Sequence, residues 1–198
     1  MPLETVQRTW TIGSWMVAHA DADEVGDALA DLEADAFALQ SIRKEDVERV
    51  ADRLSMRHAW ELSYHPVSRL IPGTGVGLAV LTPHSIGDSA SVVTNNHSST
   101  WSRLRRIAQF AVVDRADQSG YTIGHAVGSP DPESMGTPPA PLVWFRPAQV
   151  DVDSSQAVGL PGDATLIDTD VRTPIANAEP MLTVTFEMPW VVGDLPVA

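Results

Sequence analysis

The order of hydrophobic patterns along the chain limits the folds that it can adopt. Two strand-then-helix units come first, with a β-branched and aromatic run at 9–17 followed by an amphipathic helical pattern at 21–32. An apolar run at 36–42 and a helical pattern at 45–54 repeat this arrangement. The later hydrophobic segments all favour strands, at 58–64, 76–82, 107–114, 121–127, 142–145, 164–167 and 181–187. Because strands outnumber helices, we predict an α+β fold, a two-sheet β-sandwich flanked by helices.

Length and composition are those of a single domain. A globular chain of 198 residues, 43% of them hydrophobic, buries about 70% of its unfolded surface in one core. We predict one domain over residues 1–190 and a C-terminal tail over 191–198. Trp190 and the apolar residues around it offer surface that another protein could cover, so we expect a protein partner or a homo-oligomer.

Charge and residue usage narrow the classes of partner. The formal net charge is −13, and Lys44 is the single lysine, so no broad basic face is available for a phosphate backbone and nucleic acid is disfavoured. The absence of cysteine excludes disulfides and thiolate metal sites. No run reaches about 18 apolar residues and the first ten residues are polar, so we expect a soluble cytoplasmic protein without a membrane span.

Several short motifs occur at the ends of the predicted strands. Ser14-Trp15-Met16 ends the first strand and Leu39-Gln40-Ser41 ends the second. His125 lies in the strand at 121–127, and Ala176-Asn177-Ala178-Glu179-Pro180 precedes the last strand. Their order and spacing resemble the endonuclease/exonuclease/phosphatase superfamily. The resemblance implies a four-layer α/β/β/α sandwich with its active site at one end. The sandwich is shortened here, because the proline-rich segment 128–141 stands in for several tens of residues.

The side chains that carry the family's chemistry are replaced in this chain. The family motifs Thr-Trp-Asn, Leu-Gln-Glu and Ser-Asp-His supply a carboxamide, a metal-binding glutamate, an aspartate and a general base. Met16, Ser41, Asn177 and Ala178 stand at those positions, while His125 matches the histidine of a Thr-His-Leu motif. The resemblance therefore implies five vestigial positions and no intact catalytic or metal site.

Two other alignments of the C-terminal motifs stay open. Gly162-Asp163-Ala164-Thr165 resembles a Gly-Asp-x-Asn motif, and Gly193-Asp194-Leu195-Pro196 resembles the Asp-His-x-Pro ending. Threonine and leucine stand there where the family has asparagine and histidine. Each alignment loses the base.

Phosphodiester hydrolysis needs a metal ion, an activated water and a nearby base, and removing one such group typically costs about 10² to 10⁴ in rate. We therefore expect a catalytically inactive relative without a cofactor, acting as a binding or structural component through protein–protein contacts. The alternative is a divergent Mg- or Mn-dependent phosphodiesterase with a rebuilt site at His125, Asp163 and Asp168. A third hypothesis is a ligand-binding module that uses the vestigial cleft.

Overall fold

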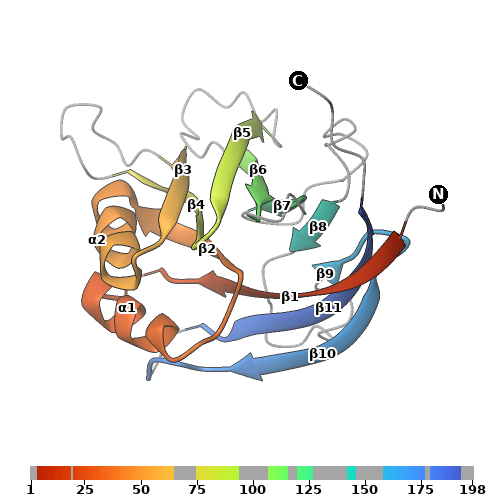
Figure 1. Cartoon of the computed structure of the whole chain (residues 1–198). Helices are drawn as coiled ribbons and strands as arrows, with labels where there is room; N and C mark the ends of the chain where they lie inside the picture. The colour runs from red at the N-terminus through yellow and green to blue at the C-terminus, as the bar shows by residue number, and fades with distance from the viewer. Residues whose placement is uncertain are drawn as a thin grey trace.

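The computed structural model describes residues 4–18, 20–64, 75–93, 107–115, 120–126, 142–145, 158–176 and 179–192. These residues form two β-sheets and two helices (Figure 1). Sheet A has six strands in the order β10-β11-β1-β2-β4-β3, and sheet B has five in the order β5-β6-β7-β8-β9. The two-sheet sandwich predicted from the hydrophobic patterns is thus confirmed.

The elements follow one another along the chain as expected from the strand–helix opening. Sheet A consists of β1 (Glu4–Met16), β2 (Ala36–Arg43), β3 (Arg57–Tyr64), β4 (Val76–Thr82), β10 (Thr165–Arg172) and β11 (Met181–Val192). Sheet B consists of β5 (Ser85–Val93), β6 (Ile107–Asp114), β7 (Gly120–Ala126), β8 (Leu142–Phe145) and β9 (Val158–Gly159). The helices are α1 (Ala22–Ala30), which follows β1, and α2 (Lys44–Leu54), which follows β2. β1 and β2 are parallel neighbours, as the intervening helix requires.

Both helices lie on one face of sheet A, on the side away from sheet B (Figure 1). Their apolar stripes, which include Val25, Leu29, Val47 and Val50, pack against Phe37 and other residues of the sheet. The acidic first turns of both helices carry negative charge where the helix dipole favours it. None of the helices among the described residues has the length and apolar character needed to span a bilayer.

The main core lies between the two sheets. Strand residues alternate in direction, so every second side chain of β1, β2, β6, β7 and β11 enters this core. Trp10, Tyr121, Phe145 and Phe186 are its largest members and are at most 1% exposed. Burying a side chain of this size contributes about 1.5–3 kcal/mol relative to leaving it in water. A smaller cluster on the outer face of sheet B contains Phe110 and Trp144.

Five strands differ from the sequence predictions. β1 (Glu4–Met16) begins five residues before its predicted start, and β10 (Thr165–Arg172) continues five residues past its predicted end. β5 forms where only a turn was expected, because most of its side chains are exposed and give no apolar period. β9 has two residues and no signal of its own. β11 continues past Glu187 to Val192 through Pro189, where β1 is its only neighbour in the described part of the sheet. A missing backbone N–H is tolerated at such an open edge. The segment 128–141, predicted to be a loop, lies outside the described residues.

Candidate functional site

A polar layer closes the inter-sheet core near the ends of β1 and β2. Ser14 and Gln40 come from sheet A, and Gln109 and His125 come from sheet B. They continue the inward-facing rows formed by Ile12 and other apolar residues, so strand alternation alone directs them between the sheets. All four are buried, and His125 and Gln109 are 0% exposed.

Hydrogen bonds join these four side chains across the sandwich. The Gln40 amide nitrogen donates to the Ala38 carbonyl oxygen at 2.9 Å and to Ser14 Oγ at 3.1 Å, and it lies 3.2 Å from His125 Nδ1. On the other side of the ring, His125 Nε2 lies 2.9 Å from Gln109 Oε1. The Gln109 amide nitrogen in turn donates to the Ala59 carbonyl oxygen at 3.2 Å. The layer therefore links β1, β2 and β3 of sheet A to β6 and β7 of sheet B.

The partners fix the protonation state of His125. Because the amide nitrogen of Gln109 donates to a carbonyl, its oxygen is the group that faces the ring, so Nε2 carries the proton. Nδ1 is then the unprotonated ring nitrogen and faces the Gln40 amide, whose two hydrogens are shared among the Ala38 carbonyl oxygen, Ser14 Oγ and Nδ1. Burial lowers the pKa of His125 from 6.5 to about 3. A second ring proton would also face the Gln40 amide donor, so the imidazole is held neutral with both nitrogens occupied.

The structure places Met16 and Ser41 at the ends of neighbouring strands but on different faces of sheet A. Met16 is paired with Gln40 in the parallel register and is half-buried on the inter-sheet side. A β-bulge sets Ser41 outside the regular pairing, between Gln40 opposite Leu78 and Ile42 opposite Gly77. Ser41 adopts a φ of 58°, in the left-handed region that costs a non-glycine residue about 1–2 kcal/mol.

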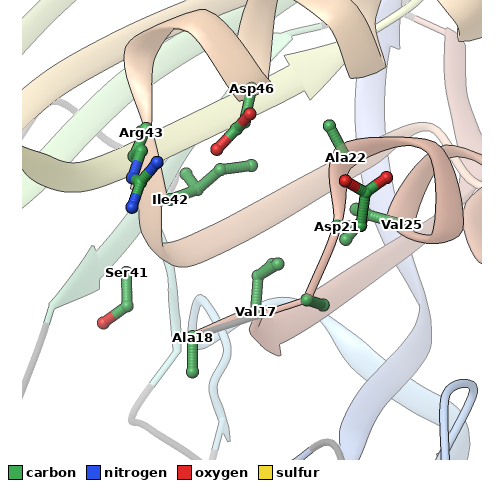
Figure 2. A pocket seen from close by; sticks show the side chains of 10 residues that line it. Val17, Ala18, Asp21, Ala22, Val25, Ser41, Ile42, Arg43 and Asp46 are labelled. Atoms are coloured by element: carbon green, nitrogen blue, oxygen red, sulfur yellow. The ribbon is translucent and has the colours of Figure 1, made fainter. Parts of the chain in front are cut away.

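Ser41 lies on the helix side of the sheet, the face that strand alternation already gives to Phe37 and Leu39. It lines a pocket of ≈ 270 Å³ between the ends of β1 and β2 and the first turns of the two helices, where Arg43, Asp21 and Asp46 also lie (Figure 2). Burial raises the pKa of Asp46 against the opposing effect of the Arg43 guanidinium. The pocket has mixed charge, and His125 is not among its lining residues.

The remaining residues of the candidate sites do not join this layer. Asn177 and Ala178 lie outside the described residues. Asp163 is exposed in the turn before β10, and Asp168 lines a separate pocket of ≈ 610 Å³ on the helix side of sheet A. The structure therefore does not bring Asp163 and Asp168 to His125. In the part of the chain that the structure describes, no three His, Asp or Glu side chains are grouped closely enough to hold a metal ion.

A second polar cluster, which no sequence motif predicts, joins the sheets at the start of β2. The Asp35 carboxylate accepts from the Thr11 backbone N–H at 2.8 Å, pairs with Arg115, and lies 3.1 Å from His84 Nε2. The Arg115 guanidinium carbon stands 3.7 Å from the centre of the Trp10 ring. Asp35 precedes a strand of sheet A and Arg115 follows one of sheet B, so the cluster ties the sheets together at the end opposite His125.

Known structures share this architecture. An endonuclease/exonuclease/phosphatase from Beutenbergia cavernae DSM 12333 aligns with a TM-score of 0.70 and 13% identity over 96% of this chain and 73% of its own. An endonuclease/exonuclease/phosphatase family protein from Bacteroides thetaiotaomicron aligns at 0.68 and 10% identity over 93% of this chain and 97% of its own. The human Nocturnin catalytic domain, solved with a bound sulfate anion, aligns with a TM-score of 0.64 and 9% identity over 93% of this chain and 96% of its own.

No family model and no curated protein sequence matches this chain, so the likeness is one of structure. It agrees with the family that the motifs at the strand ends predicted. On this evidence the chain has the fold of the endonuclease/exonuclease/phosphatase superfamily.

Proposed function

We propose that this protein is a catalytically inactive member of that fold, working without a metal cofactor as a binding or structural component through protein–protein contacts. We place the protein in the cytoplasm as part of the same proposal. The partner is another protein or a second copy of the chain.

The state of His125 is the single observation that carries this proposal. A general base must reach the proton that it removes and must be free to accept it. The ring of His125 is 0% exposed, and glutamine side chains occupy both of its nitrogens. With a pKa lowered to about 3 by burial, it resists taking up a proton in neutral solution. The one histidine retained at a motif position thus serves the packing of the two sheets.

The residues at the neighbouring motif positions also support catalytic inactivity. Met16 offers a thioether where the family has a carboxamide, and a thioether is a poor ligand for magnesium. Ser41 stands where the family has the metal-binding glutamate, and it lines the pocket beside the helix N-termini, whose lining residues do not include His125. A phosphate ester between the sheets would find no anionic ligand from these two positions.

A turnover assay tests the proposal. The protein would be incubated with magnesium or manganese and bis-p-nitrophenyl phosphate, single-stranded DNA or a phosphoinositide, beside a known magnesium-dependent phosphodiesterase. We expect no metal-dependent product above the rate without protein. His125→Gln, which can keep hydrogen bonds to its neighbours, serves as a folded control if His125→Ala does not fold. Robust metal-dependent turnover that either variant abolishes would refute the proposal.

A further inference from the structure

Strand β10 leaves one edge of sheet A unpaired among the described residues. It also concentrates exposed apolar surface. Four large hydrophobic side chains are exposed in the described part of the chain, and three of them belong to this strand: Leu166 at 41%, Ile167 at 50% and Val171 at 53%. An exposed edge with apolar side chains is a template for pairing with another strand.

The register with β11 separates the side chains of β10 onto two faces. Thr169 and Val171 lie opposite Val184 and Leu182, whose side chains enter the inter-sheet core. Directly opposed residues share a face of a sheet, so Val171 lies on the inter-sheet side. Asp168, Asp170 and Arg172 alternate with them and lie on the helix side, where they line the ≈ 610 Å³ pocket. The free edge thus carries an apolar face and a charged face.

The charged face is complementary to itself under a twofold axis. Edge-to-edge antiparallel pairing of two copies sets residues of the same face opposite each other, and the position of the axis fixes the register. With the axis at Thr169, Asp168 would oppose Asp170 of the second copy twice, which like charges disfavour. With the axis at Asp170, Asp168 would face Arg172 on each side, but the Asp170 carboxylate would face its own counterpart on the axis.

An axis at Val171 removes both conflicts. Asp170 then faces Arg172 of the second copy on each side of the axis, so two oppositely charged pairs form. Val171 packs against its counterpart on the apolar face, and Thr169 faces Thr173, the first residue after β10. Within one chain Arg172 already lies 2.7 Å from Asp170, and both side chains are about half exposed, so each can reach a partner without unfolding any element.

We propose that β10 is a self-association surface, and that two copies of this chain join sheet A to sheet A across a twofold axis at Val171. The inference rests on the proposed function in that it names a partner for the binding role. The charges on the edge then have two effects, since they oppose the other registers and select this one.

Single-cysteine cross-linking tests the register, because the chain has no cysteine of its own. In Val171→Cys the two thiols would meet on the axis, and mild oxidation should give a disulfide-linked dimer on a non-reducing gel. Leu166→Cys is the matched control, since it is also exposed and on the same strand. In the proposed register its two copies stand ten positions out of alignment, about 33 Å apart, so it should cross-link at least tenfold more slowly.

Charge exchange tests the pairing on the same background. Asp170→Arg or Arg172→Asp added to Val171→Cys sets like charges across the axis, and each should slow cross-linking by about tenfold. The double exchange Asp170→Arg/Arg172→Asp restores opposite charges and should restore the rate. Equal cross-linking through positions 166 and 171, no cross-linking through 171, or a double exchange as slow as the single ones would overturn the proposal.

The two proposals fail separately. Loss of the selective cross-link in a protein without turnover would remove the dimer and leave the inactive fold standing. A selective cross-link in a protein with metal-dependent turnover would support the dimer and refute the proposal that the protein is inactive.

Discussion

Individual residues decide whether this fold can act on a substrate, and His125 is the clearest case. The motif at 121–127 identified it, and strand alternation directed it between the sheets. Its partners were harder to predict. Gln109 is one polar residue in the apolar strand β6, and sequence alone gives no sign of what faces it on the opposite sheet. A single glutamine at an inward position of an apolar strand is nevertheless a useful signal, because a buried amide needs partners.

The neutral state of His125 makes the free energy of unfolding depend on pH. The folded protein holds the ring at a pKa of about 3, whereas the unfolded chain titrates near 6.5. The unfolded state therefore binds more protons between these values, and stability falls as pH falls from 6.5 toward 3, by at most about 1.4 kcal/mol per pH unit. Above pH 6.5 this contribution is fully present.

Urea unfolding of the native protein and His125→Gln, measured at a series of pH values between about 7 and 4, checks this sign. The carboxylates titrate in both proteins, so the difference between the two isolates the ring. We expect the advantage of the native protein over the variant to shrink as pH falls. An advantage that stays constant would contradict a buried neutral histidine.

At the scale of elements, the hydrophobic period predicted helices and strands well, whereas local irregularities in the backbone could not be predicted. The two helices, β2, β4, β6 and β8 were predicted within a residue or two at each end, because each carries a clear apolar pattern. The bulge at Ser41 could not be predicted, since a serine after an apolar run gives no sign of a left-handed backbone. That one extra residue puts Ile42 on the helix side with Phe37 and Leu39, where unbroken alternation would turn it between the sheets.

The glycine opposite this bulge should be intolerant of a side chain. A Cβ on Gly77 would stand 2.1 Å from the Glu61 carbonyl oxygen and 2.8 Å from the Trp60 ring, which crosses this position to donate from Nε1 to the Ile42 carbonyl oxygen. We expect Gly77→Ala to destabilise the protein by more than about 2 kcal/mol, since backbone on two strands must move.

Thermal unfolding followed by circular dichroism measures this loss. Gly162→Ala is the matched control, because a Cβ there meets nothing within 4 Å, and its midpoint should lie close to that of the native protein. Equal midpoints for the two variants would show that the strands around Gly77 adapt freely.

The whole molecule depends on how the two sheets are held together. Apolar side chains fill the space between them. Polar contacts link the sheets at both ends, with hydrogen bonds to His125 at one end and the Asp35–Arg115 ion pair at the other. The second polar cluster was not predicted from the sequence, because Asp35, His84 and Arg115 are far apart in the chain and lie in loops. Only the topology brings them together.

We expect Asp35→Asn to lower the free energy of unfolding by about 1–3 kcal/mol, because the side chain is 17% exposed and its loss of charge leaves Arg115 without its carboxylate. Glu48→Gln is the comparison. Glu48 pairs with Lys44, and the two side chains are 51% and 65% exposed, respectively. Its substitution should therefore change the free energy of unfolding by less than about 0.5 kcal/mol. Urea unfolding of both variants measures the contrast, and similar losses would mean that Asp35 does not join the sheets.

The pairing of β1 with β11 has a consequence for the order of assembly. β1 occupies an inner position of sheet A, yet one of its two neighbours is made from residues 181–192, and Thr9 meets Glu187 across 178 positions of chain (Figure 1). During synthesis, residues 181–192 must therefore leave the ribosome before β11 can pair with β1 and complete the burial of Trp10. Until then one edge of β1 has no partner strand and is available to a chaperone. Because the pairing joins distant parts of the chain, we expect it to form slowly and late in folding.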